Sequence, residues 1–309
     1  MKQYLDLLND VLENGIYKDD RTKVGTISVF GRQIRFKMSD GFPAVTTKTL
    51  YWKSVVSELL WFLEGSTNEH RLAEIKNDNK HYDELTYEQK HTIWTENYDY
   101  QGRALGYTDG ELGNIYGKQW RRYSSAVEVR DRLRGSKDLY NVYYINKDID
   151  QISDVIEQIK NNPNSRRLIV SAWNPCDLSN MTLPPCHYSF QFYVDGDNLS
   201  LMWNQRSCDV GCGLPFNIAS YALLLNIVAR ITGKIPYELI GSIGDCHVYK
   251  NHIEPLKEQL TRTPHKLPTL ELPDADYSNI DTFLKSVKTS DFKLKDYIHD
   301  EPIKLKMAV

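Results

Sequence analysis

The sequence predicts a mixed α/β (α+β) fold centred on one sheet, and two observations carry this prediction. Apolar residues alternate with polar ones through 188–194 and again through 199–203, with a turn cluster at 195–198 between them. Such alternation is typical of two strands joined as a hairpin. Segments 50–63 and 217–233, which lie before and after it, carry apolar residues at helical spacing.

Nothing in the sequence divides the chain, and we expect one domain over residues 1–309. No Pro/Gly/Ser-rich joint, internal repeat or low-complexity run occurs, and a chain of 309 residues can bury a sizeable core. Two polar, charged segments, 76–91 and 121–147, are predicted to be surface insertions. We expect solvated loops there, with partner surfaces as the alternative.

The first third of the chain predicts a helix, a bent strand pair and a second helix. Residues 1–12 form an amphipathic pattern that carries acids. The motif Asp20-Arg21-Thr22 precedes an alternating segment, 27–36, which Gly31 interrupts like a bulge. Residues 50–63 predict a helix that ends at Gly65.

The remaining elements surround the hairpin. A helical stripe over 149–159 stops at Pro163, and Arg166-Arg167 stand at the entrance of the apolar strand 168–173. After the hairpin, Gly211, Gly213 and Pro215 break the strand, so a helix should begin at 216–217 and end near Gly233. We also expect a strand over 237–249 and a helix over 252–260, and Ile303, Leu305 and Met307 alternate near the terminus.

Composition excludes several classes of protein. The net charge of −3 gives no overall attraction to nucleic acid or to an anionic membrane. The N-terminus lacks the pattern of a signal peptide, and no uninterrupted apolar run approaches membrane-spanning length, so we expect a cytoplasmic protein. The five cysteines lack CxxC spacing, so we expect neither disulfides nor a metal site.

Cys186 is the candidate nucleophile. Pro184 and Pro185 fix the backbone just before it, and the hairpin returns Arg206 beside it. A nearby cation favours the thiolate, which is the nucleophilic form. The alternatives are a buried core thiol and a protease-like pair with His187, but His187 is adjacent in sequence and would point to the opposite strand face.

Several polar residues suggest recognition of a nucleotide. Guanidinium groups match phosphate oxygens in geometry and charge. Four arginines and a hydroxyl would therefore form a phosphate site if they converge: Arg21, Arg166, Arg167, Arg206 and Ser207. The alternative is that they are ordinary surface residues. Asn217, which falls in the first turn of the expected helix, offers a donor and an acceptor that match uracil, although it could also cap that helix. His247 and Tyr249 share one face of a strand.

Glu58 lies among apolar positions of its predicted helix. An isolated buried carboxylate is costly, so this residue is either paired in the core or functional. Burial should raise its pKa and let it exchange protons near neutral pH.

Many short segments, spread over nearly the whole chain and in family order, resemble the thymidylate synthase family. They are DRT (20–22), FPAVTTK (42–48), ELLWFLEGSTN (58–68), YGKQW (116–120), SRR (165–167), SAWNP (171–175), LPPCH (183–187), QRSCD (205–209), GLPFNIASYALL (213–224), GDCHVYKNH (244–252) and KMAV (306–309). The resemblance implies a single catalytic domain of that fold and a homodimer formed through the sheet face. It also implies that Arg166 and Arg167 reach into the partner's site.

The resemblance further implies reductive methylation of dUMP to dTMP, with methylene-tetrahydrofolate as one-carbon and hydride donor and dihydrofolate as the second product. No metal and no DNA are required, and binding of its own messenger RNA is left open. The implied catalytic residues are Cys186, Glu58, Arg206, Asn217, Tyr116, His187 and Asp209. The implied dUMP-binding residues are Arg21, Arg166, Arg167, Arg206, Ser207, Gln205, Asn217, His247 and Tyr249.

The implied folate site consists of Trp94, Leu183, Asp209, Gly213, Phe216, Lys48, Ala308 and Val309. Departures from the family pattern, such as Thr49 in place of a basic residue and Asn204 in place of tyrosine, concern the folate tail and loops rather than the chemistry. Two alternatives stay open. One is a dUMP or dCMP hydroxymethylase of the same family, in which water captures the exocyclic methylene. The other is an inactive regulator that binds nucleotide or RNA.

Overall fold

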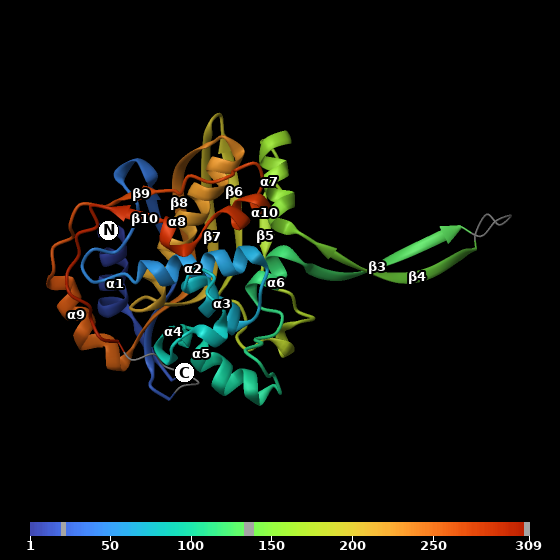
Figure 1. The fold of residues 1–309 in the computed structure, drawn as a ribbon. Helices are drawn as coiled ribbons and strands as arrows, with labels where there is room; N and C mark the ends of the chain where they lie inside the picture. The colour runs from blue at the N-terminus through green and yellow to red at the C-terminus, as the bar shows by residue number, and fades with distance from the viewer. Residues whose placement is uncertain (20–22, 133–138, 306–309) are drawn as a thin grey trace.

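The computed structural model describes residues 1–19, 23–132 and 139–305. Among these residues a single large sheet of six strands has the order β1-β2-β8-β7-β6-β5 (Figure 1). Its strands are β1 (Ile16–Lys18), β2 (Thr26–Lys37), β5 (Ile169–Ser171), β6 (His187–Asp195), β7 (Asn198–Asp209) and β8 (Ile235–Tyr249). Neighbouring strands are antiparallel except β7 and β8, which are parallel. The predicted sheet-centred α/β class is confirmed.

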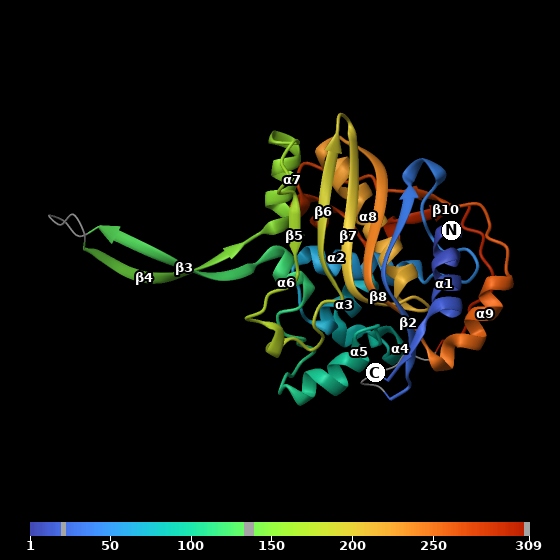
Figure 2. The same cartoon turned by 180° about the vertical axis from the view of Figure 1, so that it is seen from behind.

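Helices cover one face of the sheet. The apolar helices α2 (Trp52–Glu64) and α8 (Gly213–Thr232) pack on it, and Figure 1 shows both in front of the strands. Each ends at a glycine with positive φ, Gly65 at 78° and Gly233 at 67°, a conformation that glycine adopts without strain. In Figure 2, which shows the opposite face, no described helix covers the middle strands β6, β7 and β8.

Helix α8 alone among the described helices is long and apolar enough to cross a membrane, with a mean hydropathy of 1.4 over the best window. The fold explains this composition without a bilayer, because 78% of that window is buried inside the protein. A helix that is apolar on all sides belongs in a core.

The predicted hairpin is formed by β6 and β7. Phe190, Phe192 and Val194 point to the buried side, where Phe190 pairs with Trp203 across the ladder. The register shifts between His187 and Ser189, so the strand is irregular directly after Cys186. On the other side of β7, Gly241 pairs with Trp203, and a Cβ on Gly241 would lie 2.4 Å from the indole.

A helical region lies below the sheet in Figure 1. It comprises α3 (Glu69–Lys76), a 3-10 turn at Tyr82–Glu84, α4 (Tyr87–Lys90), α5 (Thr95–Asn97), a π-helical turn at Tyr98–Gly102 and α6 (Tyr116–Arg121). Segment 76–91, predicted as a polar surface loop, therefore contains short helical pieces. The capping box of Thr86 and Gln89 explains one of them.

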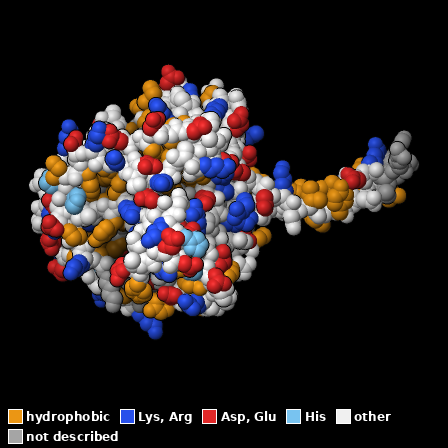
Figure 3. Space-filling model, viewed as in Figure 1, with side chains coloured by type: hydrophobic (Ala, Val, Ile, Leu, Met, Phe, Trp, Pro, Cys, Tyr) orange, Lys and Arg blue, Asp and Glu red, His pale blue; other side chains and the backbone are white. Residues whose placement is uncertain are grey.

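Segment 121–147 also differs from the expected loop. Strands β3 (Tyr123–Arg132) and β4 (Tyr140–Ile149) form an antiparallel ribbon, which projects from the body as a narrow arm (Figures 1 and 2). Cross-strand pairs such as Val127 with Ile145 and Val129 with Tyr143 account for it. Figure 3 shows apolar side chains gathered midway along this arm.

The other elements frame the sheet. They are α1 (Lys2–Asn14), α7 (Gln151–Asn161), α9 (Ile253–Thr261), β9 (Thr269–Glu271), α10 (Ile280–Ser286) and β10 (Lys293–Lys295). The expected bent strand pair over 27–36 is instead one continuous strand, β2, in which Gly31 has a φ of 72°. Ile303 and Leu305 are not in a strand, and Met307 lies outside the described residues.

Candidate active site

A cavity of about 340 Å³ opens between α2, the start of β6, the end of β7 and α8. Most of the residues predicted from the sequence for catalysis and binding line it. They are Glu58, Trp94, Tyr116, Leu183, Cys186, His187, Gln205, Ser207, Asp209, Gly213, Phe216, Asn217 and Tyr249. Arg21, Ala308 and Val309 lie outside the described residues.

Cys186 and Arg206 lie together, as the hairpin predicted. The backbone N–H of Arg206 donates to the carbonyl of Cys186 at 2.8 Å, and its Nη2 lies 3.9 Å from the Cys186 Sγ. The guanidinium is held by the carbonyls of Pro184 and Pro185, at 2.8 and 2.9 Å. The two prolines therefore orient the arginine as well as the cysteine.

The expected thiolate is not the favoured state of Cys186 in the protein without ligands. Burial raises the pKa of the thiol, and Arg206 lowers it by less than burial raises it. The hairpin pattern predicted the direction in which the arginine shifts this pKa, but it could not weigh that effect against desolvation. The pKa of the Cys186 thiol is thus raised on balance, and Arg206 limits the rise.

Tyr116 and His187 pack against each other beside Cys186. Their rings stack with centroids 4.3 Å apart, and the Tyr116 hydroxyl accepts from the backbone N–H of Cys186 at 2.7 Å. The Nδ1 of His187 is 2.8 Å from the hydroxyl of Tyr221 on α8. Burial lowers the pKa of His187 to about 3, so its imidazole is neutral at physiological pH.

Glu58 on α2 lines the cavity. Its Oε1 accepts a hydrogen bond from the Trp94 indole at 2.7 Å. Burial raises the pKa of Glu58 to about 7, and the bond from Trp94 opposes this rise only partly. A carboxyl group with that pKa populates both protonation states near neutral pH, which suits proton transfer.

Asn217 lies deeper in its helix than expected. Helix α8 begins at Gly213, three residues before the predicted start, so Asn217 is past the first turn and does not cap it. The Gln205 amide donates to the Asn217 Oδ1 at 3.1 Å and is itself held by the Trp203 indole. This pair fixes the Asn217 amide so that its nitrogen is the donor left for a ligand.

Asp209 organises the turn before α8. Its Oδ1 accepts from the backbone N–H groups of Gly211 and Cys212 at 2.8 and 3.0 Å. Lys48 donates to the carbonyl of Gly211, behind this turn, and burial lowers its pKa. Lys48 therefore supports the wall of the cavity and does not line it.

Asp209, Cys212 and His252 bring ligand-type atoms within 4.8 Å of one another. Backbone N–H groups already occupy the Oδ1 of Asp209, and burial, then the charge of Asp209, raises the pKa of Cys212 to about 12. A protonated thiol is a poor metal ligand. We therefore treat the three as packing around the turn.

The predicted phosphate residues are only partly brought together. Arg206 and Ser207 are adjacent to Cys186, whereas Arg166 and Arg167 are exposed just before β5 and do not line the cavity of their own chain. His247 also lies off the cavity, with its Nδ1 3.1 Å from Asp245.

Several members of the site were not predicted from the sequence. Ile93 and Cys212 line the cavity, and Tyr221 holds His187 from behind. Asn97, a polar neighbour of Trp94 that could admit water, also lines the cavity. Asn97 follows Trp94 by three residues, which is the helical signal that could have placed both on one face. Tyr221 carried no signal, because it is one apolar-periodic position among many in α8.

Comparison with known proteins gives consistent results. The family model described as thymidylate synthase matches residues 2–309. The thymidylate synthase of Enterobacteria phage T4 is 46% identical over 316 residues, and that of Listeria monocytogenes serotype 4b is 44% identical over 343 residues, each alignment covering 100% of both chains. The crystal structure of the enzyme from phage T4 superposes with a TM-score of 0.85 and also covers 100% of both chains.

Proposed function

We propose how this chain, which belongs to the thymidylate synthase family, performs the methyl transfer of that family: Cys186 is the nucleophile that activates dUMP. The observation that carries the proposal is the position of the Cys186 Sγ, 3.9 Å from Arg206 and inside the cavity that Glu58 and Asn217 also line. The nucleophile, the proton carrier and the amide thus face one cavity, and the cation contacts the sulfur of the nucleophile.

Ionisation of the thiol comes first, and the charge of Arg206 favours it against the effect of burial. Arg206 is largely exposed and accessible to a nucleotide's phosphate, while its Nη2 contacts the sulfur. The thiol gives its proton to water, the sulfur adds to carbon six of the uracil ring, and the electron pair of the carbon five–carbon six double bond moves toward the ring carbonyl. The Asn217 nitrogen, fixed by Gln205, donates to the uracil edge where this charge develops.

Glu58 is the proton carrier of the proposal. Its pKa of about 7 allows it to give and take protons at neutral pH, directly or through water. His187 stays neutral, and the hydroxyl of Tyr221 fixes its ring. We assign His187 and Tyr116 to the positioning of water and of the backbone at Cys186.

The cavity wall fits a flat, hydrogen-bonding co-substrate such as methylene-tetrahydrofolate. Trp94, Leu183 and Phe216 provide apolar surface, and the carboxylate of Asp209 can accept from ring N–H groups. This co-substrate supplies the one-carbon unit and the hydride. Trp94 would both contact it and exclude water from the reacting carbon.

A homodimer formed through the sheet face is part of the proposal. Strands of the sheet carry exposed apolar side chains, including Ile169 (48% exposed) and Tyr193 (67% exposed). An apolar face of this kind is usually covered by a partner. Arg166 and Arg167 lie at the entrance of edge strand β5, outside their own cavity. They would then serve the site of the partner.

We also assign the protein to the cytoplasm. All five cysteines are free, which suits a reducing compartment.

A second candidate, hydroxymethylation of dUMP, is favoured by one observation. Asn97 lines the cavity close to Trp94 and presents a polar side chain that could hold water near the reacting carbon. The test is an assay with dUMP and methylene-tetrahydrofolate, in which dihydrofolate is followed spectrophotometrically and the product is identified by mass. We expect dTMP and stoichiometric dihydrofolate. Hydroxymethyl-dUMP without dihydrofolate would favour the second candidate.

A further inference from the structure

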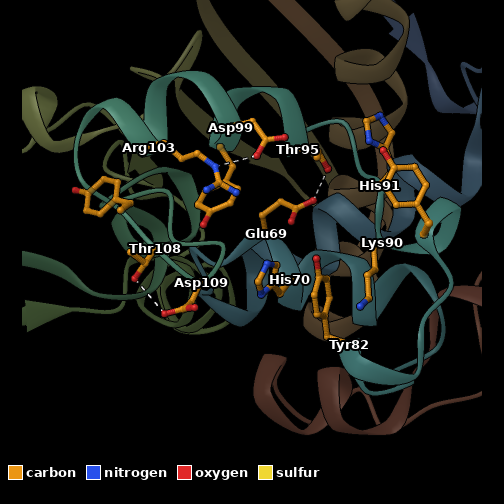
Figure 4. Close-up of a pocket in the computed structure, with 13 residues that line it drawn as sticks. Glu69, His70, Tyr82, Lys90, His91, Thr95, Asp99, Arg103, Thr108 and Asp109 are labelled. Atoms are coloured by element: carbon orange, nitrogen blue, oxygen red, sulfur yellow. Dashed lines mark hydrogen bonds and ion pairs between the residues drawn. The ribbon is translucent and has the colours of Figure 1, made fainter.

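A second cavity, of about 500 Å³, lies in the helical region below the sheet (Figure 4). Its walls come from α3, the turn at Tyr82–Glu84, α4, the segment 95–103 and the loop 107–109. It therefore includes part of the insertion 76–91. None of its lining residues lines the cavity that contains Cys186.

Aromatic and imidazole rings dominate this second cavity: His70, Tyr82, Tyr87, His91, Tyr98 and Tyr107. His70 stacks on Tyr82, and their ring centroids are 3.8 Å apart. Figure 4 shows the two rings beside each other. Tyr87 is 86% exposed at the rim, so its ring is open to a ligand. A cavity of this volume lined by rings suits a flat heteroaromatic molecule of nucleotide size.

The polar group at the bottom is Glu69, which is only 2% exposed. The hydroxyls of Thr92 and Thr95 both donate to its Oε1, at 2.8 and 2.5 Å. Within the described residues, the other oxygen, Oε2, accepts no hydrogen bond, although Glu69 lines the cavity. This oxygen is open to the cavity, where water or a ligand can donate a hydrogen bond to it.

The rim carries both signs of charge. Arg103 is paired with Asp99 at 3.1 Å, and Asp109 accepts from Thr108 at 3.0 Å. Lys90 lies 4.5 Å from the centre of the Tyr82 ring, and among the described residues it has no carboxylate within 4.0 Å. Lys90 is thus the rim cation left for an anionic group.

We propose that this cavity binds a nucleotide whose base carries an exocyclic amino group, as cytosine and adenine do. The amino group donates to Glu69, the base stacks against the rings, and Lys90 contacts the phosphates. Carboxylates are established acceptors for the amino group of cytosine. Thymine has a carbonyl in that position, which would place two acceptors against each other.

A chain of hydrogen bonds connects this cavity to the catalytic one. Thr92 donates to Glu69 at 2.8 Å, the backbone N–H of Trp94 donates to the Thr92 hydroxyl at 3.1 Å, and the Trp94 indole donates to Glu58 at 2.7 Å. Segment 92–98 therefore separates the two cavities. A ligand that donates a hydrogen bond to Glu69 therefore acts, through this chain, on the wall of the proposed folate site. This coupling rests on the proposed function, whereas the binding itself does not.

The experiment is a calorimetric titration of the full chain, saturated with dUMP, with dCTP, dATP and dTTP. We expect dCTP and dATP to bind at least tenfold more tightly than dTTP. Glu69→Gln should remove this preference, whereas Glu84→Gln, an equal charge change at an exposed position outside the cavity, should keep it. Equal binding of the three nucleotides, or binding of none at millimolar concentration, would overturn the proposal.

Lys90→Gln provides a second test that leaves the buried carboxylate intact. It should weaken dCTP about tenfold and leave deoxycytidine, which has no phosphate, unaffected. Equal weakening of both, or of neither, would contradict the assigned role of Lys90.

The coupling between the two cavities is tested by turnover. Addition of dCTP should change the KM for methylene-tetrahydrofolate and leave the KM for dUMP constant. An unchanged KM for methylene-tetrahydrofolate would refute the coupling while the binding stands.

Discussion

Glu58 and His187 are buried in one site, and burial shifts their pKa values in opposite directions. Between its ordinary value of 4.5 and about 7, Glu58 keeps a proton in the folded protein that the unfolded chain releases, so the free energy of unfolding falls as pH rises through this interval. Between about 3 and its ordinary value of 6.5, folding excludes a proton from His187, so the free energy of unfolding rises with pH there. The two contributions oppose each other where the intervals overlap.

Substitution of Glu58 should reveal the contribution of His187 to the pH dependence of the free energy of unfolding. Glu58→Gln leaves the His187 contribution unopposed, so between pH 4.5 and 6.5 the free energy of unfolding should rise with pH more steeply than in the wild type, by about 1.4 kcal/mol per pH unit. Urea titrations at several pH values measure this difference. Glu84→Gln, at an exposed position, should run parallel to the wild type. Parallel curves for Glu58→Gln as well would refute the raised pKa.

At this scale the sequence predicted which residues lie together at the site better than it predicted the contacts that hold them. Cys186, Arg206 and Glu58 could be identified because prolines, hairpin alternation and a carboxyl group on an apolar helix face leave local patterns. The bonds of Trp94 to Glu58, of Gln205 to Asn217 and of Tyr221 to His187 could not, because they join segments whose spacing only the fold sets. The pKa of Cys186 could not be predicted either, because it depends mainly on burial, which only the fold sets.

The projecting arm of β3 and β4 is the element least tied to the body. Its apolar side chains remain exposed, with Val142 at 53% and Tyr144 at 68%. A two-stranded ribbon has little stability by itself, so it adds little to the core. The hydroxyl of Ser124 donates to Asp148 at 2.5 Å near the base of the arm.

Removal of the arm is therefore expected to leave the fold intact. A variant in which Asn-Gly replaces residues 125–147 joins Ser124 to Asp148, which are cross-strand partners. Its free energy of unfolding should change by less than about 1 kcal/mol, and turnover of dUMP should persist. Chemical denaturation measures the first and the dihydrofolate assay the second. A loss of several kcal/mol would show that the arm supports the core.

Elements with regular periodicity were predicted well, and those with polar sequences were not. The alternation of β6 and β7 and the apolar spacing of α2 predicted them because one face of each is buried. The arm has apolar residues on both faces, and neither face is buried. The charged residues between them therefore obscured the alternation in the sequence. The start of α8 was placed late because Gly213 and Pro215, which break helices elsewhere, stand in its first turn.

At the scale of the whole molecule, the dimer predicts complementation between subunits. Mixing Cys186→Ala with Arg166→Ala chains should give heterodimers with one intact site. At equal amounts, activity should reach about a quarter of the wild-type value, because half of the dimers are mixed and each has one working site of two. Turnover is measured after the chains are unfolded together and refolded.

A matched mixture supplies the control. Cys186→Ala with Glu58→Gln should stay inactive, because both residues belong to the site of one chain and every heterodimeric site lacks one of them. If confirmed heterodimers of Cys186→Ala and Arg166→Ala are equally inactive, each site is built from a single chain and the proposed role of Arg166 is wrong.

The most direct measurement of the central claim, that Cys186 attacks dUMP, is the mass of the protein after incubation with fluoro-dUMP and methylene-tetrahydrofolate. Fluorine at carbon five blocks the proton removal that completes the reaction, so the covalent intermediate accumulates. We predict a mass increase equal to nucleotide plus folate, mapped by peptide analysis to Cys186 and absent from Cys186→Ala. An adduct on another cysteine, or an equal adduct in Cys186→Ala, would contradict the account.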